Sequence, residues 1–306
     1  MVPVLLGSAI LIFFLLFVLP GDPAVFIAGG RGTEAQVELI RRSLGLDRPV
    51  PVQFVDWLWR TAHGDFGTSY INGFSVKVLL LQRLPVTAEL ALGAIVVATA
   101  IGLPAGLAGA LWSEGPIGRL IDLFNAVAIA VPVFWLGILF QIYIGLQLGI
   151  LPALGYVAFT DDPVENLRSM VLPSLTLGLG IAAVIARFLK AGILEGLRQN
   201  YVVTARAKGL SRRRVLFKHV LRNALMSVVT VTGLQFGGLL GGAVLTESVF
   251  NLPGLGNLMW ISIQRRDYFV IQALTLLTVA VFLLVNLATD LTYGFIDPRI
   301  RTQEEQ

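Results

Sequence analysis

The chain has 306 residues, of which 56% are hydrophobic and 14% charged, and its mean hydropathy is +0.79. These values exclude an ordinary soluble domain and indicate an integral membrane protein. The net charge is +4, but the basic excess is concentrated in one segment, so membrane topology explains it better than nucleic-acid binding does. The sequence contains no cysteine, which excludes disulfides and thiolate metal sites.

Six segments free of Asp, Glu, Lys and Arg can each supply the roughly 20 apolar residues that a bilayer core requires. They are residues 1–21, 90–113, 123–160, 169–186, 223–246 and 268–289. We therefore predict an all-α integral membrane protein with six transmembrane helices. The third segment is too long for one span, and its Gly and Pro residues predict a helix end near Leu148. A further uncharged segment, 248–264, contains Asn, Pro and Gly and is predicted not to span.

Residues 1–20 form the first predicted span. We interpret it as a retained anchor rather than a cleaved signal peptide, because no small-residue cleavage site follows Leu19. The next segment, 21–84, is too short and polar for a large core and is expected to form a small extracytoplasmic cap between helices 1 and 2.

Two short helices are expected within this cap. Thr33 and Gln36 predict a capping box at the start of the first helix, and Gly45 predicts its end. The second helix carries Trp57 and Trp59, which are expected either at the membrane interface or packed on the outer ends of the spans.

Charged residues flank the predicted spans and are expected near the lipid headgroups: Glu89, Asp122, Arg187, Lys190, Glu247 and Asp290. Milder polar side chains occur within the spans. Four of these are candidates for lining a solute pathway: Asn125, Gln141, Thr232 and Gln235. Hydrogen bonding between helices is the alternative and commoner role for such residues.

Glycine spacing predicts close helix packing in two spans. Gly233, Gly237 and Gly241 recur every four residues in the fifth span, and Gly102 and Gly106 repeat the pattern in the second. The spacing leaves open whether the packing neighbour belongs to this chain or to another subunit.

A strongly basic segment separates the fourth and fifth spans. Residues 196–224 contain eight Lys or Arg residues and no Asp or Glu. Positive charge favours the cytoplasmic side of a membrane. Alternation then places both termini in the cytoplasm and exposes 21–84, 149–168 and 247–267 on the outer face.

The basic segment is predicted to form a helix, a tight turn and a second helix. Asn200 is the expected N-cap of a helix through Lys208, and Gly209 the left-handed stop. Ser211 is expected to cap a second helix that runs to about Asn223. The helix dipole disfavours the arginines at 212–214. Topology, anionic lipid or an acidic protein partner would explain these three arginines better than stability does.

An enzyme is not expected. Both histidines, His63 and His219, lie outside the predicted spans. The spans therefore contain no histidine that could form an intramembrane Ser-His or metal-His centre. No lysine follows a glycine, which excludes a GxxxxGK[ST] phosphate loop. We therefore predict no catalytic residue, no metal site and no cofactor in this chain, and ATP-driven transport would need ATP bound by another polypeptide.

Residues 201–225, YVVTARAKGLSRRRVLFKHVLRNAL, resemble the cytoplasmic loop of inner-membrane permeases in dipeptide and oligopeptide ABC importers. Further similar segments occur in the family's order: LPGDPA at 19–24, LGLDRPVPVQFVDWL at 44–58, HGDFGTS at 63–69, RLPVTAELAL at 83–92, LTESVFNLPGLGNL at 245–258 and FIDPRIR at 295–301. The resemblance covers nearly the whole chain. It implies the type I importer permease fold, which is the fold of MetI-like permeases, and a function in peptide import.

In the wider importer superfamily this loop carries Glu-Ala-Ala, three residues, Gly, nine residues and then Ile-x-Leu-Pro, and it docks on the ATPase subunit. Residues 203–205 take the place of the triplet here, and Gly209 and Leu221 match the pattern. His219 and Arg222 depart from it. The resemblance implies an ATPase-coupling role for Tyr201, Val203, Thr204, Ala205, Arg206, Ala207, Lys208, Gly209, Leu210, Ser211, Arg212, Arg213 and Arg214.

The resemblance also implies the partners: a second homologous permease, two ATP-binding subunits that hold ATP and Mg, an external substrate-binding protein, and membrane lipid. A turn formed by Glu247, Asn251, Gly254 and Gly256 is expected to act as a gate or to contact the substrate-binding protein, or else to be plain loop. The implied regions are span 1–20, cap 21–84, permease core 85–292 with the coupling loop 196–224, and cytoplasmic tail 293–306.

Three alternative functions remain at this stage. A permease of the same family could carry another small solute, such as a chelated metal. A secondary transporter would need intramembrane acids or paired broken helices, and neither pattern is found in the sequence. A membrane scaffold without a transport role would leave the basic segment unexplained.

Overall fold

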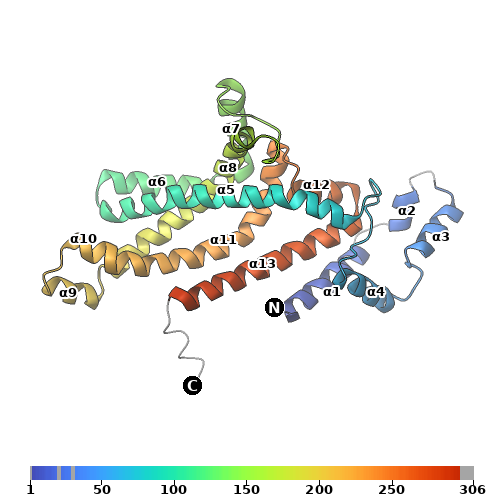
Figure 1. Ribbon diagram of the computed structural model, residues 1–306, viewed down its shortest axis with the longest axis horizontal. Helices are drawn as coiled ribbons and strands as arrows, with labels where there is room; N and C mark the ends of the chain where they lie inside the picture. The colour runs from blue at the N-terminus through green and yellow to red at the C-terminus, as the bar shows by residue number, and fades with distance from the viewer. Residues whose placement is uncertain (1, 19–21, 29–31, 297–306) are drawn as a thin grey trace, which may run out of the picture. The chain divides into compact units, whose positions relative to one another are not determined.

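The computed structural model describes residues 2–18, 22–28 and 32–296. Apart from one isolated antiparallel bridge between Thr68 and Ser75, the regular structure in these ranges is helical (Figure 1). The predicted all-α class is therefore confirmed. Residues 297–306, which include most of the predicted tail and the end of the FIDPRIR match, lie outside the described residues. The chain divides into two compact units, one made of 1–85 with 257–283 and the other of 86–256 with 284–306.

The first unit contains four short helices, most of a fifth, the start of one long helix and the first part of another. Its helices are α1 (Val2–Val18), α2 (Pro23–Ala28), α3 (Glu34–Ser43), α4 (Val50–Ala62), the beginning of α5 (Val76–Leu111), most of α12 (Leu255–Arg265) and the beginning of α13 (Tyr268–Ile296). The predicted capping box is present, with Thr33 and Gln36 bonding each other's backbone N–H groups. Gly45 follows α3 in the left-handed conformation, with φ of +68°.

Aromatic side chains join α1 to α4 in this unit. The ring of Phe13 lies 5.3 Å from that of Phe54 and 5.7 Å from that of Trp57. Offset and edge contacts at such distances stabilise aromatic pairs. Trp57 therefore packs on the first helix, whereas Trp59 is 67% exposed.

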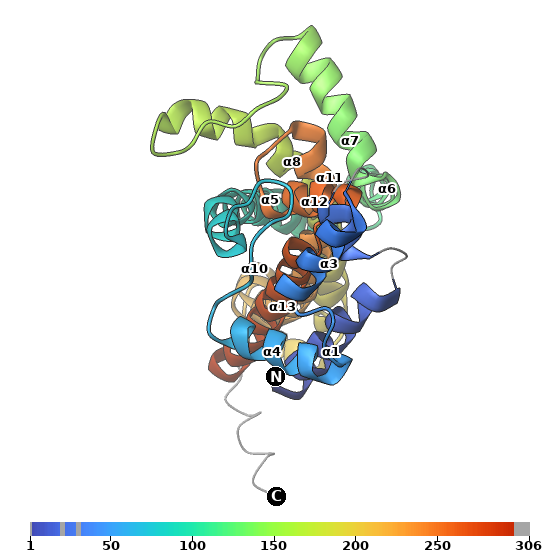
Figure 2. The same cartoon turned by 90° about the vertical axis from the view of Figure 1, so that its right-hand side faces the viewer.

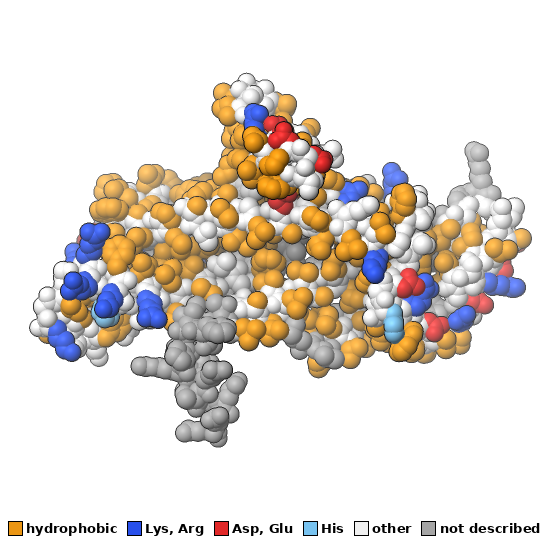
Figure 3. Space-filling model, viewed as in Figure 1, with side chains coloured by type: hydrophobic (Ala, Val, Ile, Leu, Met, Phe, Trp, Pro, Cys, Tyr) orange, Lys and Arg blue, Asp and Glu red, His pale blue; other side chains and the backbone are white. Residues whose placement is uncertain are grey.

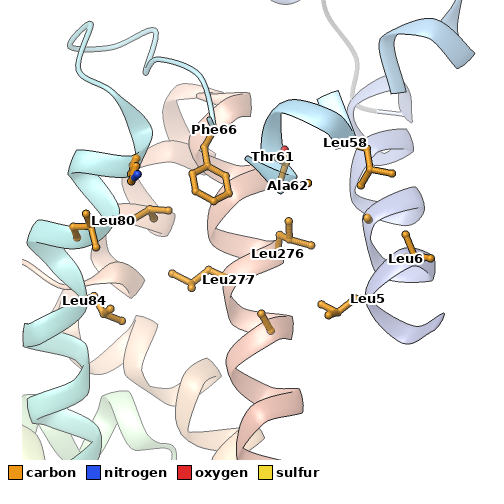
Figure 4. Close-up of a pocket in the computed structure, with 14 residues that line it drawn as sticks. Leu5, Leu6, Leu58, Thr61, Ala62, Phe66, Leu80, Leu84, Leu276 and Leu277 are labelled. Carbon is orange, nitrogen blue, oxygen red and sulfur yellow. The ribbon is translucent and has the colours of Figure 1, made fainter. Parts of the chain in front are cut away.

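An apolar cavity of about 550 Å³ lies among α1, α4, α5 and α13 of the first unit (Figure 4). Leucines such as Leu5, Leu58, Leu80 and Leu276 point into it from all four helices. Thr61 and Lys77 contribute the polar side chains of its lining.

The second unit is built around α8 (Pro163–Gly196). Its other helices are α6 (Pro116–Ala130), α7 (Val133–Phe140), the π-helix η1 (Gln141–Gln147), α9 (Asn200–Ala207), α10 (Arg212–Val215), the π-helix η2 (Leu216–Val220) and α11 (Leu221–Phe250), together with the rest of α5 and α13. Helix α8 packs against α6, α7 and α11, and most extensively against α11. Its side chains Leu172, Ile185 and Ile193 are fully buried.

Glycines allow α5 to approach α8 at backbone distance. A Cβ atom added at Gly102 would lie 2.7 Å from the carbonyl oxygen of Ala182, and one added at Gly106 would lie 2.8 Å from that of Ala186. The predicted close packing of the second span is therefore made within this chain. In the fifth span Gly233 packs against Thr289, while a Cβ at Gly238 or Gly241 would have no described residue outside its own helix turn within 4 Å.

Four helical segments are long and apolar enough to cross a membrane, namely α5, α8, residues 212–239 and residues 268–289. These correspond to four of the six predicted spans. The predicted helix end near Leu148 is confirmed, because η1 ends at Gln147 with Leu148 as its C-cap. The sequence did not predict the break within this segment, where α6 and α7 meet at an angle of 102° (Figure 2). The bend lies at Val131, the C-cap of α6, and Pro132, the N-cap of α7. Pro132 has no N–H to donate and cannot continue the hydrogen bonds of α6.

The first predicted span is shorter than a full crossing in the described residues, where α1 has 17 residues and its apolar stretch is Pro3–Phe14. The uncharged segment at 248–264 forms a turn and the 11-residue α12, which is too short to span, as predicted.

Replacing Gly178 tests the close contact between α5 and α8. A Cβ at this position would lie 2.7 Å from the carbonyl oxygen of Ala94 and 2.8 Å from Cβ of Val97. We expect Gly178→Ala to lower the stability of the detergent-purified chain by about 1–3 kcal/mol, because the helices must separate. Thermal or chemical unfolding measures the change.

The matched control is Gly180→Ala, two residues along the same helix. Its nearest neighbour would be the carbonyl oxygen of Ala128 at 3.8 Å, an ordinary contact. This variant should be neutral or slightly stabilised, because Ala is the better helix former. Equal destabilisation by both substitutions would contradict the proposed backbone contact.

Candidate functional site

The basic segment folds as the predicted helix, turn and helix. Helix α9 ends in a Schellman motif: the Gly209 N–H donates to the carbonyl of Arg206, and the Leu210 N–H donates to that of Ala205. Gly209 has a φ of +78°, as the left-handed stop requires. The Ser211 side chain then accepts from the backbone N–H of Arg214 and caps α10. The predicted helix stop at Gly209 and the predicted N-cap at Ser211 are therefore confirmed.

Two boundaries of this segment were predicted wrongly. Gln199, not Asn200, is the N-cap of α9, and its side chain makes no capping bond. The second helix does not end near Asn223, because α10 continues through the π-helix η2 directly into α11. The π-helix keeps the chain helical where caps would otherwise be needed. The second helix of the basic segment is therefore the start of a continuous helical stretch from Arg212 to Phe250, of which α11 forms the last 30 residues.

One face of the α9–α10 segment (residues 200–215) is buried and apolar. Val202 and Val215 of this segment, and Val220 of the η2 helix that follows it, are at most 1% exposed. All three belong to the hydrophobic core of the second unit. A Cβ added at Gly196, the last residue of α8, would lie 2.9 Å from a methyl group of Val220. The segment is therefore fixed to the end of α8 by packing.

The opposite face of the segment is exposed and basic. Arg206, Lys208 and the arginines at 212–214 are all exposed. Figure 3 shows Lys and Arg side chains gathered over the end of the second unit that α9 and α10 form, beside largely hydrophobic helix faces. The Arg213 guanidinium lies 6.0 Å from the centre of the Phe217 ring, within cation–π range. Such a face suits an anionic or acidic surface.

Most of the predicted coupling residues lie on this exposed face. Tyr201, Val203, Thr204, Ala207 and Gly209 are exposed, and Leu210 is half-buried. Ala205 is the exception, because it is 9% exposed and packs into the core. Among the residues that match the importer triplet, Ala205 therefore has a packing role.

A buried carboxylate occupies the other end of α11. Glu247, which the sequence predicted near the lipid headgroups, is 0% exposed and lies inside the second unit. The Thr87 hydroxyl of α5 donates to Glu247 Oε1 at 2.6 Å and accepts from the backbone N–H of Leu255 at 2.8 Å. One hydroxyl thus joins α5, α11 and the first residue of α12.

The two glycines of the predicted external turn lie directly against this carboxylate. A Cβ at Gly254 would come within 2.3 Å of the Glu247 carboxylate oxygens, and one at Gly256 within 2.5 Å of Val244 Cα. Asn251 is exposed and adopts the left-handed conformation, where it ends α11. The structure brings the four predicted turn residues together, with Glu247 inside and Asn251 outside.

The four candidate pathway residues differ in their surroundings. The Gln141 amide donates to the carbonyl oxygens of Val249 at 2.7 Å and Ala153 at 3.2 Å, so it joins η1 to α11. Thr232 donates to the carbonyl of Val228 in its own helix, and Gln235 is half-buried. Asn125 is 4% exposed, and its Oδ1 accepts no hydrogen bond in the described part of the chain.

Several polar contacts were not predicted from the sequence. The Lys190 ammonium donates to both carboxylate oxygens of Asp122, at 2.6 and 2.8 Å, and joins α8 to α6. The Tyr156 hydroxyl donates to Glu89 at 3.0 Å. Burial and this hydrogen bond raise the pKa of Tyr156 to about 12, so the hydroxyl keeps its proton at neutral pH. The sequence gives no signal for these partners, because the two residues of each pair are more than 60 positions apart.

The described residues contain no group of three or more His, Asp or Glu side chains that could hold a metal ion. Their arrangement instead combines several membrane-length helices with an exposed basic turn fixed to the end of two of them. This is the architecture of a multi-pass membrane subunit that contacts another protein or a charged surface.

The chain belongs to the family of binding-protein-dependent transport system inner membrane components, whose model matches residues 100–302. The model of the family's N-terminal part matches residues 1–91. The chain is therefore a subunit of an ABC importer in the inner membrane and is not itself an enzyme.

Two curated relatives are similar along nearly their whole length. A putative peptide transport system permease protein of Brucella abortus is 41% identical over 98% of this chain and 96% of its own. The glutathione transport system permease protein GsiC of Salmonella typhimurium is 41% identical over the same shares. An inward-facing structure of the MetNI methionine ABC transporter, 18% identical, covers 72% of this chain and 96% of its own with a TM-score of 0.60. It shows that the fold is that of a MetI-like permease.

Replacing Thr87 tests the hydroxyl that joins three helices. Thr87→Val keeps the shape but leaves the buried Glu247 carboxylate and the Leu255 N–H without this partner. We expect it to lower stability by about 1–3 kcal/mol, the cost of unsatisfied buried polar groups. Unfolding of the detergent-purified chain measures the loss.

Thr87→Ser is the matched control, since it retains the hydroxyl and should cost less than the valine variant. If valine and serine proved equally stable, the hydrogen bonds would not be what holds the turn.

Proposed function

We propose that this chain is the permease subunit of an ABC importer that moves peptides of the dipeptide or oligopeptide class into the cytoplasm. ATP hydrolysis would occur on two separate ATP-binding subunits, which would hold ATP and Mg. The observation that supports this proposal most directly is the structure of the α9–α10 segment. Its basic face is exposed, its apolar face is packed in the core of the second unit, and α10 continues through η2 into α11.

Mechanically, this segment is suited to act as a lever. A surface that pushes on Arg212 would move α11 with it, because α10, η2 and α11 form one continuous helix. ATP binding can bias the permease only if the ATPase subunits bind one of its conformations more tightly than the other. The predicted coupling residues other than the buried Ala205, namely residues 201, 203, 204 and 206–214, are the proposed contacts for that difference.

For the membrane topology we propose six crossings with both termini in the cytoplasm. The four long segments, the bent pair α6–α7 and α1 would each cross once. Segment 196–224 would then be cytoplasmic, and 21–84 would be an extracytoplasmic cap. The proposed regions remain 1–20, 21–84, 85–292 and 293–306.

A second permease subunit and a substrate-binding protein complete the proposed assembly. Gly238 and Gly241 of α11 have no neighbour among the described residues of other helices, and such small residues would suit close packing with the second permease. The turn of Glu247, Asn251, Gly254 and Gly256 is the proposed gate or substrate-binding-protein contact. Asn251 would make the surface contact, because Glu247 is buried.

Peptides are the proposed solute because the Brucella relative is described as a peptide permease and the Salmonella relative as a permease for glutathione, itself a peptide. Another small solute, such as a chelated metal, is the alternative within the family. Uptake assays with the complete set of subunits distinguish these solutes.

Replacing Gly209 tests the coupling role. Gly209→Val forces a β-branched residue into a left-handed conformation, at a cost of about 1–2 kcal/mol. We expect it, and deletion of 205–215, to reduce ATP-dependent uptake by proteoliposomes at least about tenfold without preventing membrane insertion. Co-purification of the ATPase subunits should fall in parallel.

Gly209→Asn is the control, because Asn tolerates the left-handed conformation far better than Val does. It should retain most of the uptake. Normal uptake by the deletion variant would exclude the coupling role.

Accessibility labelling tests the topology. Single cysteines introduced at Arg213 and at Asn72, both exposed, are expected to react from opposite sides of the membrane. A membrane-impermeant maleimide added to intact cells should label only the variant at position 72. Labelling of position 213 from outside would contradict the proposed orientation.

A further inference from the structure

A second cavity of the first unit, of about 750 Å³, differs from the apolar one in Figure 4 by its charged and polar walls. We call it the polar pocket. Its walls are the end of α3, one face of α4, the loop at 65–70 and the first turns of α13. Its volume lies in the range of small-molecule sites.

Sequence spacing explains how α4 and α13 line the polar pocket. Gln53, Asp56, Trp57 and Arg60 are spaced as i, i+3, i+4 and i+7, so they share one face of α4. Tyr268 and Gln272 lie one turn apart on α13. Two helices therefore present aligned rows of side chains to the same space.

Helix α13 contributes two buried polar side chains to the pocket whose polar atoms lack hydrogen-bond partners in the described part of the chain. Gln272 is 2% exposed, and in the described part of the chain neither its amide oxygen nor its amide nitrogen has a hydrogen-bond partner. The hydroxyl of Tyr268, which is 1% exposed, also has none there. Buried polar groups without partners cost about 1–3 kcal/mol each, so such a pair in a cavity wall points to a ligand that bonds them.

The entrance of the pocket carries balanced charge. Arg48 pairs with Asp56 at 2.9 Å, Arg60 pairs with Asp65 at 2.8 Å, and Arg41 pairs with Asp22. A guanidinium has five N–H donors, so an ion pair that uses one of them leaves others for a ligand. The Arg60 guanidinium and the Gly67 N–H hold the pKa of Asp65 below its usual range, which keeps that carboxylate charged. A ligand with one positive and one negative end matches this entrance.

Aromatic rings complete the pocket. Trp57 and Trp59 line it from α4, while Tyr70 and Phe269 line it from the other side with ring centres 5.0 Å apart. These rings offer apolar surface to a side chain of a ligand. Burial raises the pKa of Tyr70, so its hydroxyl stays protonated.

We propose that the polar pocket binds a short peptide with free termini. A peptide unit offers a carbonyl acceptor and an N–H donor, which together match the unpaired amide of Gln272. Its terminal carboxylate and ammonium would bond the guanidinium and carboxylate groups at the entrance. The inference rests on the proposed function, which makes peptides the solute and 21–84 an external segment; the pocket would then be a receiving site at the outer end of the span that begins at Tyr268.

A zwitterionic lipid headgroup shares the charge pattern but not the amide chemistry. A phosphatidylethanolamine headgroup carries a phosphate and an ammonium, and it has no amide to pair with Gln272. The peptide therefore accounts for one more feature of the pocket than the lipid does.

Calorimetric titration of the full chain in phosphatidylcholine nanodiscs tests the proposal, with tri-alanine and its N-acetylated, C-amidated form as probes. We expect tri-alanine to bind at one site and the blocked form to bind at least tenfold more weakly. Gln272→Leu should weaken tri-alanine binding at least tenfold. Gln264→Leu, the same change at an exposed position of α12 outside the pocket, should leave it unaltered.

Arg60→Gln provides a second variant on the rim, where the Arg60 side chain is 58% exposed. It should weaken binding of tri-alanine but not of the blocked peptide. The proposal is overturned if tri-alanine does not bind, if Gln272→Leu binds as well as the unaltered chain, or if phosphatidylethanolamine in the nanodisc displaces the peptide. These titrations contain no ATPase, so they test the pocket separately from the coupling role. Peptide binding can be absent while the Gly209→Val variant still shows the expected loss of uptake, and the opposite result is also possible.

Discussion

Close contact between helix backbones around α8 is the constraint on which the second unit depends. Glycines at 102 and 106 of α5, and at 178 of α8, let the two helices meet at carbonyl distance. Lipid tails are as apolar as leucine side chains, so burial alone cannot hold helices together in a bilayer, and tight packing has to do so. The same helix carries Lys190, whose ion pair with Asp122 adds α6, and it packs along α11. One helix thus organises the others.

This arrangement relates the two ends of α11. At its start, the α9–α10 segment is packed against the end of α8 by apolar side chains, and its charge faces outward. At its end, about 45 Å away for 30 helical residues, Glu247 is held by Thr87 and covered by two glycines. A helix fixed at both ends transmits displacement rather than absorbing it. That property suits a subunit that receives work at one surface and changes access at another.

Glu247 also shows why a buried acid is not enough to assign ion coupling. An intramembrane carboxylate is by default a candidate for proton or ion transfer. Here one oxygen accepts from Thr87, and the glycine backbones at 254 and 256 lie against the carboxylate. The group is therefore held in place within the turn by a side chain of α5 and by the backbone of the turn itself.

The sequence by itself determined the helical membrane class, most of the spans and the local shape of the basic segment. These follow from hydropathy and from short-range rules, such as the left-handed glycine at 209 and the serine cap at 211. Only the tertiary structure decided that α6 and α7 bend at residues 131–132, that Ala205 is buried, and that Thr87 meets Glu247. It also decided that Gln272 lines a pocket with residues more than 200 positions earlier. The physical reason is that local backbone preferences are set by neighbouring residues, whereas burial and hydrogen-bond partners depend on segments that meet only when the helices pack.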